Sequence, residues 1–167
     1  MTAITLPDAE KVLAALTAQM RPQVSAQTGL IGIVTGGAWL AERLHSELKL
    51  EVPFGTLDVS FYRDDFQRKG LKRKVLPSEV PFDVAGRDLI LVDDVLYTGR
   101  TIRAAMNELF DYGRPASIRL AALVDRGGRE LPIAAQFVGA TLALPAQQSI
   151  GLKRDAQGRL SLELAKG

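Results

Sequence analysis

The chain of 167 residues contains no cysteine and only one histidine, His45. The lack of cysteine excludes disulfide bonds, thiol nucleophiles and zinc–thiolate sites. A single histidine excludes a multi-histidine metal site and gives little support to a serine–histidine–aspartate triad, and we expect His45 to be a solvated helix residue. The sequence also lacks a leader-like N-terminal segment and any apolar run close to the ~20 residues of a membrane helix. We therefore expect a soluble cytoplasmic protein.

An excess of charge of one sign is also absent. The net charge is +2, and charged residues make up 24% of the chain against 47% for hydrophobic residues. These proportions are typical of a soluble globular protein, and the overall balance does not by itself require a nucleic acid partner. A chain of this length suits one domain with a sizeable core, so residues 1–167 are expected to form a single domain.

Short apolar runs alternate with segments of helical periodicity along the chain. Runs rich in Leu, Ile and Val predict buried strands, and apolar residues at intervals of three or four predict helices. This alternation predicts an α/β fold with a mainly parallel sheet covered on both faces, in which ligands bind beyond the carboxyl ends of the strands. The predicted strands are residues 30–34, 54–62, 88–92, 117–124 and 136–141, with an edge strand at 160–164; the predicted helices run from the N-cap Asp8 to about residue 24, through Leu40, Leu44 and Leu48, and over residues 102–110.

Residues 88–101 are the most informative part of the sequence. An apolar run ends at two adjacent carboxylates, Asp93 and Asp94, and a loop of small and hydroxyl residues leads into a predicted helix. Free backbone N–H groups and the helix dipole favour a phosphate at such a place. The carboxylates are better explained as acceptors for sugar hydroxyls or as partners of a hydrated Mg²⁺ ion. The segment therefore predicts a ribose-5-phosphate site, and the alternative is an ordinary strand–turn–helix with a polar tip.

These residues carry a resemblance to a known family. Residues 92–101 resemble the phosphoribosyl-pyrophosphate (PRPP) motif of type I phosphoribosyltransferases. The order Val-Leu-Tyr-Thr-Gly-Arg-Thr after the acids is similar to the PyrR family, uracil phosphoribosyltransferases that often also regulate pyrimidine genes by binding RNA. Several ordered motifs are more specific than any one of them. The likeness covers about residues 7–139, with further matching segments at residues 57–65, 80–84, 123–127 and 129–133.

The resemblance implies a type I phosphoribosyltransferase fold and the conversion of uracil and PRPP to UMP and pyrophosphate with Mg²⁺. It also implies a flexible loop at about residues 63–81, a base-pocket hood at about residues 125–150, and a homodimer or a higher assembly of dimers. Asp93, Asp94 and Arg63 would be catalytic, and the two aspartates would hold Mg²⁺ through water. PRPP would be bound by Asp93, Asp94, Val95, Leu96, Tyr97, Thr98, Gly99, Arg100, Thr101, Thr35, Gly36 and Gly37, and the base by Asp125 and Arg126.

The loop at residues 35–37 departs from the family pattern, which usually has basic side chains there. This chain has Val34 and Gly36 at those points, so pyrophosphate would lose a charge-assisted contact and depend more on backbone N–H groups. A plain strand-to-helix turn is the alternative for this loop. A basic cluster at residues 68–74 is either solvated surface or a group that folds down over the leaving pyrophosphate.

Two other functions fit parts of the pattern. A purine phosphoribosyltransferase would share the PRPP motif, although residues 124–133 favour a pyrimidine. An RNA-binding regulator that senses UMP would need several cations on one face, because phosphate neutralisation dominates RNA affinity. We therefore predict little RNA binding, since most positions that would supply those cations hold Val12, Leu13, Ala18, Gly128, Ala134 and Ala140, which leaves Arg129 nearly alone.

Overall fold

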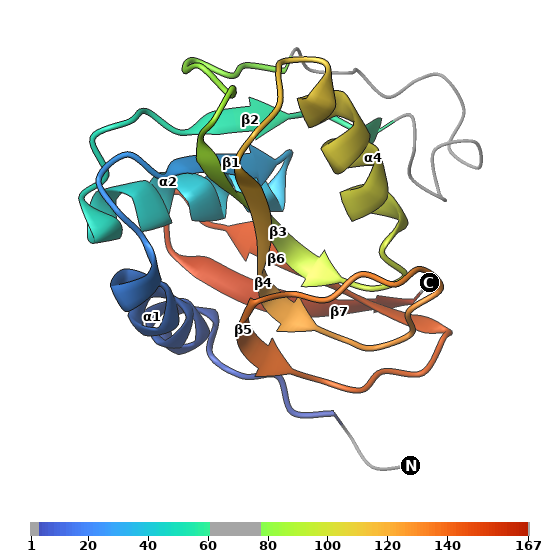
Figure 1. The fold of residues 1–167 in the computed structure, drawn as a ribbon. Helices are drawn as coiled ribbons and strands as arrows, with labels where there is room; N and C mark the ends of the chain where they lie inside the picture. Colours follow the sequence, from blue (N-terminus) through green and yellow to red (C-terminus); the bar gives the residue numbers. More distant parts are fainter. Residues whose placement is uncertain (1–3, 61–77, 167) are drawn as a thin grey trace.

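A five-stranded parallel sheet in the order β2-β1-β3-β4-β5 forms the centre of the structure (Figure 1). The computed structural model describes residues 4–60 and 78–166. The parallel sheet that was predicted from the alternation of elements is therefore confirmed. Its strands are β1 (Gly29–Ile33), β2 (Gly55–Leu57), β3 (Asp88–Leu96), β4 (Ser117–Asp125) and β5 (Phe137–Thr141).

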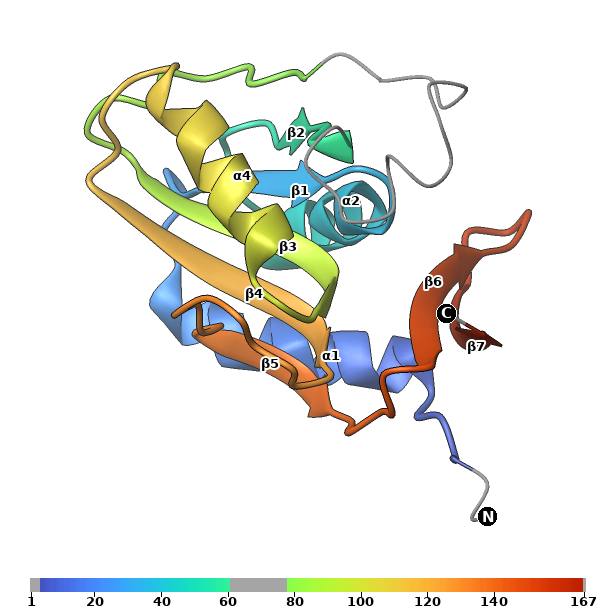
Figure 2. The ribbon, with the colours of Figure 1, turned by 90° about the vertical axis from the view of Figure 1, so that its right-hand side faces the viewer.

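Helices cover both faces of the sheet, as the sequence predicted (Figures 1 and 2). On one face, α1 (Ala9–Met20) and α2 (Gly36–Leu48) bury side chains such as Leu16 and Leu44 in one apolar core. On the other face, α4 (Arg100–Phe110) buries Ile102 and Leu109 in a second core. Helix α1 begins at the predicted place because the Asp8 carboxylate accepts a hydrogen bond from the Glu10 N–H at 2.9 Å. No helix within residues 4–60 and 78–166 is long and apolar enough to cross a membrane.

The carboxyl-terminal strand belongs to a separate hairpin. Strand β7 (Leu160–Lys166) pairs antiparallel with β6 (Gln148–Arg154), which the sequence analysis missed, and Figure 2 shows this hairpin to one side of the main sheet. The Asp155 carboxylate forms the connecting turn by accepting the N–H groups of Gln157 and Arg159, each at 2.9 Å. The strand predicted at residues 160–164 is thus present, and it pairs with β6 outside the main sheet.

Strand β3 continues past the point where the sequence predicted its end. It runs through Asp93 and Asp94 to Leu96 because neighbouring β4 supplies partners this far, with Asp93 opposite Ala122 and Leu96 opposite Asp125. The strand expected at residues 54–62 is shorter, since β2 ends at Leu57, and residues 61 and 62 lie outside the described parts.

His45 is less solvated than the sequence suggested. Its ring is half-buried, and Nε2 lies 2.9 Å from the carbonyl oxygen of Val52. The ring also packs against Phe54, with a distance of 5.8 Å between the ring centroids. His45 therefore connects α2 to the segment that leads into β2.

Candidate active site

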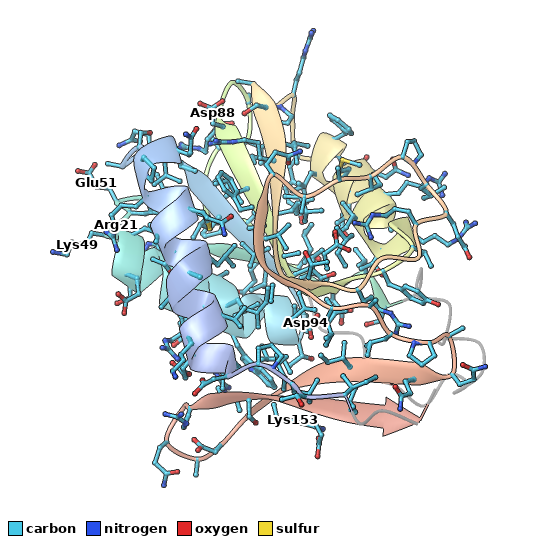
Figure 3. All side chains as sticks on the ribbon, turned by 90° about the horizontal axis from the view of Figure 1, so that it is seen from below. Arg21, Lys49, Glu51, Asp88, Asp94 and Lys153 are labelled. Atoms are coloured by element: carbon cyan, nitrogen blue, oxygen red, sulfur yellow. The ribbon has the colours of Figure 1, made fainter. Side chains whose placement is uncertain are left out.

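The two acids of the central motif lie at the carboxyl end of β3. Figure 3 shows Asp94 at the opposite end of this strand from Asp88. Asp93 is only 3% exposed, and one of its carboxylate oxygens accepts the N–H of Asp94 at 2.9 Å. Asp94 is half-buried, with Oδ1 accepting the N–H of Val95 at 2.9 Å. Both acids are therefore fixed by the backbone at the edge where ligands of parallel sheets bind.

The residues predicted as a loop, 35–37, form the N-cap and first turn of α2, and this helix start lies beside Asp94. Gly36 and Gly37 are buried, and a Cβ added at Gly36 would collide with the Asp94 carboxylate. A Cβ at Gly37 would collide with the carbonyl of Val92 in β3. Only glycines allow the start of α2 to approach β3 so closely. Thr35 is the exposed N-cap residue of α2 and makes no side-chain cap hydrogen bond, so the structure brings this helix start and the acid pair together.

The loop after β3 leads into the start of α4. Gly99 is the N-cap residue with φ 96°, and α4 has no side-chain cap hydrogen bond. The Thr98 side-chain oxygen accepts the N–H of Arg100 at 3.2 Å. A helix N-terminus without a side-chain cap carries unsatisfied N–H groups and a partial positive charge, which suit an anion. The geometry of residues 95–101 thus fits the phosphate role that the sequence predicted for them.

The predicted base-binding residues are engaged by other parts of the protein. Burial raises the pKa of Asp125, but hydrogen bonds from Arg129 and the Gly127 N–H, with the charge of Arg129, outweigh this and lower it from its usual value. Arg126 is 7% exposed, and its guanidinium lies 3.9 Å from the centre of the Tyr97 ring. It also donates to the carbonyls of Pro145 and Gln148, at 3.2 and 2.8 Å. In this arrangement the two side chains hold the segment at residues 125–129 to Tyr97 and to residues 145–148.

Arg129 forms several contacts in this region. The sequence had suggested it only as one of the few cations that could bind RNA. Its guanidinium donates to the Asp125 carboxylate, to the carbonyl of Tyr97 at 2.7 Å and to the carbonyl of Ile133 at 2.8 Å. The spacing of four residues between Asp125 and Arg129 is the feature of the sequence that could have predicted their ion pair.

At this edge, the acid pair is the group that could hold a metal ion. Among residues 4–60 and 78–166, no group of three or more His, Cys, Asp or Glu side chains could hold a metal ion. Mg²⁺ does not require such a cage, because it usually keeps several waters and binds one or two carboxylates together with substrate phosphates. Asp93 and Asp94 fit that mode of binding. Arg63 and the basic cluster at residues 68–74 lie outside the described residues.

A polar hollow of about 260 Å³ lies at the opposite end of the sheet, beside Thr28 of the β1 entry and Asp88 of β3. Its arginine, Arg87, is bound to the carbonyls of Asp83 and Gln27, each at 2.7 Å. The amino ends of parallel strands are not where open α/β sheets bind ligands. The acid pair at the carboxyl ends is therefore the stronger candidate site.

Comparisons with known proteins agree with this geometry. The phosphoribosyl transferase domain family matches residues 4–146. Bifunctional protein PyrR of Pseudomonas fluorescens is 50% identical over 153 residues, covering 92% of this chain and 91% of the relative. Bifunctional protein PyrR of Nitrosococcus oceani is 55% identical over 139 residues, covering 82% and 78%.

Solved structures show the same fold at lower sequence identity. A hypoxanthine-guanine phosphoribosyltransferase of Bacillus anthracis is 22% identical with a TM-score of 0.66, covering 85% of each chain. The enzyme of Leishmania tarentolae in complex with GMP is 18% identical with a TM-score of 0.64, covering 90% of this chain and 85% of that one. The predicted fold and family are thus confirmed, and the chain belongs to the PyrR family of phosphoribosyltransferases.

Proposed function

We propose that this phosphoribosyltransferase acts on uracil, so that uracil and PRPP give UMP and pyrophosphate. The observation that carries the PRPP part of the proposal is the close approach of Asp94 to Gly36, which puts the acid pair beside the start of α2. The start of α4 follows β3 after a short loop. One edge of the sheet thereby supplies carboxylates for a ribose and two helix starts for its phosphate groups.

Each part of this edge has a separate task in the proposed reaction. Asp93 and Asp94 accept hydrogen bonds from the ribose hydroxyls, residues 95–101 bind the 5′-phosphate, and residues 35–37 bind pyrophosphate. The bond between C1 and pyrophosphate breaks through an oxocarbenium-like state. The protein then contributes positioning of the ribose and stabilisation of the departing negative charge, and it needs no nucleophile. A reaction that needs no protein nucleophile is compatible with a chain that has no cysteine.

Magnesium is the proposed cofactor. Asp93 and Asp94 would hold the ion through water, and the bound ion would offset the negative charge of the pyrophosphate group. Arg63 remains the proposed basic partner of pyrophosphate outside the described residues. Gly36 offers no side chain to pyrophosphate, so backbone N–H groups at the start of α2 provide the contact there.

The base would bind beside the wall that follows β4. The wall is formed by residues 125–133. Asp125 and Arg126 are the proposed base-binding residues, and they would meet the base mainly through backbone groups, because Arg129 holds the Asp125 carboxylate and the Arg126 guanidinium donates to the carbonyls of Pro145 and Gln148. A purine substrate is the alternative, but the purine enzymes of similar fold are only 18–22% identical to this chain and carry no argument about the base. A pocket that pairs with the edge of uracil rejects bases whose donors and acceptors are reversed.

A base panel tests this choice directly. Uracil, orotate, hypoxanthine and guanine are each incubated with PRPP, Mg²⁺ and the protein, and nucleotide and pyrophosphate are quantified. We expect UMP from uracil and negligible product from the other three bases. Turnover of a purine without turnover of uracil would overturn the proposed substrate.

A regulatory role through RNA is the second candidate, because the relatives carry the name bifunctional. The local structure argues against it here. Val12 and Leu13 are 7% and 3% exposed and lie in the core, and a Cβ at Gly128 would collide with the Tyr97 ring. Arg129 is held by three protein groups. We propose that catalysis on uracil is the main activity and that RNA binding is weak.

A further inference from the structure

Arg129 connects three segments through one side chain. Nη1 donates to the carbonyl of Tyr97 at 2.7 Å, Nε donates to the carbonyl of Ile133 at 2.8 Å, and Nη2 forms an ion pair with Asp125. The side chain is 25% exposed, so these contacts are partly shielded from water. A guanidinium presents several donors in a fixed plane, whereas a lysine ammonium is a single point of charge that cannot span the three partners in the same way.

Residues close to Arg129 in sequence form further hydrogen bonds to the segment at residues 96–98. The N–H groups of Glu130 and Leu131 both donate to the carbonyl of Thr98, at 3.0 and 3.1 Å. On the other side, the N–H of Arg126 donates to the carbonyl of Leu96 at 3.1 Å. The base wall therefore holds three successive carbonyls of the loop that leads into α4.

The hydrogen bonds to the Tyr97 and Thr98 carbonyls also determine where the N–H groups of the same peptide units point. In a planar trans peptide, a carbonyl and the following N–H point in opposite directions. When Arg129 holds the carbonyl of Tyr97, the N–H of Thr98 is turned away from the base wall. The Thr98 carbonyl, held by Glu130 and Leu131, orients the N–H of Gly99 in the same way. These N–H groups belong to the loop proposed to bind the 5′-phosphate.

We propose that Arg129 is a positioning residue for the 5′-phosphate, acting through the Tyr97 carbonyl on the loop at residues 97–99. Its ion pair with Asp125 connects this loop to the proposed base wall, so the distance between the phosphate loop and the base wall is fixed. The proposal rests on the proposed function for the place of the phosphate. It does not depend on which base is used.

Ribose 5-phosphate is the probe for this role, because it contains the phosphate and the ribose without a base. Titration calorimetry compares wild type, Arg129→Gln and Arg129→Lys, with Arg159→Gln as a matched loss of an exposed arginine in the hairpin. We expect Kd for ribose 5-phosphate to rise about tenfold in Arg129→Gln and less in Arg129→Lys, with no change in Arg159→Gln. In turnover assays KM for PRPP should rise in parallel, while KM for uracil changes less than about twofold.

A folded Arg129→Gln variant whose Kd for ribose 5-phosphate stays within about twofold of wild type would refute the role. If Arg129→Gln does not fold, Arg129→Lys decides by the same measurement. Equal rises in KM for PRPP and for uracil would also contradict it, because that pattern indicates general loosening of the site. Absence of uracil turnover in the wild type, with the expected ribose 5-phosphate pattern intact, would instead count against the proposed base.

Discussion

The Asp94 carboxylate lies so close to Gly36 that any side chain at residue 36 would overlap it. Asp94 lies near the carboxyl end of β3, and Gly36 is the first residue of α2, which follows the neighbouring strand β1. In the proposed site, this contact sets the spacing between the ribose and the pyrophosphate.

Substitution Gly36→Ala should therefore impair catalysis. The added methyl group must displace either the Asp94 carboxylate or the start of α2, and a shift of this kind misplaces reacting groups. We expect kcat/KM for PRPP to fall at least about tenfold, measured by pyrophosphate release. Gly151→Ala is the matched control, because a Cβ at Gly151 meets nothing within 4 Å. Equal activity of the Gly36 and Gly151 variants would contradict the proposed spacing.

The carboxyl group of Glu10 has a pKa well below its usual value. The hydrogen bond from Arg43 lowers its pKa from 4.5 to about 2 against the opposing effect of burial, with further help from the N–H of Leu160 and the charges of Arg43 and Arg159. Glu10 joins three elements, since Arg43 lies in α2 and Leu160 begins β7.

This shift predicts a pH-dependent contribution to stability. A carboxylate with a lowered pKa in the folded state stabilises the fold above its unfolded pKa, and the contribution disappears as pH falls from about 4.5 towards 2. After allowance for solvent screening, Glu10→Gln should reduce the free energy of unfolding at pH 7 by about 2 kcal/mol. Urea unfolding of wild type and variant should show this difference shrink towards zero below pH 3. A difference that is constant across this range would argue against the ion pair as its source.

Glu163→Gln, which removes an exposed ion pair with Lys153, should change stability little at any pH.

RNA binding is expected to be weak, because the positions that would supply RNA-binding cations hold few of them. UMP-bound protein should bind a pyrimidine-leader RNA hairpin no better than an unrelated hairpin at physiological salt, because several phosphate-neutralising side chains are missing together. Filter-binding titration of both hairpins provides the comparison. Sub-micromolar, UMP-dependent and sequence-selective binding would restore a dual role.

Features with local signals were predicted well from the sequence. The N-cap Asp8, the apolar stripe of α2 and the buried β1 depend on residues close in sequence, and all were found at the expected places. The acid pair and the loop at residues 35–37 could be placed at one edge because the carboxyl ends of parallel strands share an edge.

Features decided by distant partners were not predicted. The end of β3 depends on its register with β4, which no residue near Asp93 encodes. Strand β6 is stabilised by pairing with β7, and its own sequence alternates only weakly. The contacts of Arg129 include Tyr97, a residue 32 positions away in the chain. In each case the interaction energy comes from a partner that appears only once the chain is folded.

The acid pair is the centre of the proposed mechanism, so its isosteric replacement is the decisive test. Steady-state formation of UMP and pyrophosphate from uracil, PRPP and Mg²⁺ is measured for wild type and Asp93→Asn/Asp94→Asn, with Asp111→Asn at the exposed far end of α4 as control. We expect equimolar UMP and pyrophosphate from the wild type and from the control. For the double variant we expect kcat/KM to be at least tenfold lower, about 1.4 kcal/mol of transition-state stabilisation. Unchanged kcat/KM in a folded double variant would contradict the ribose assignment on which the proposed function depends.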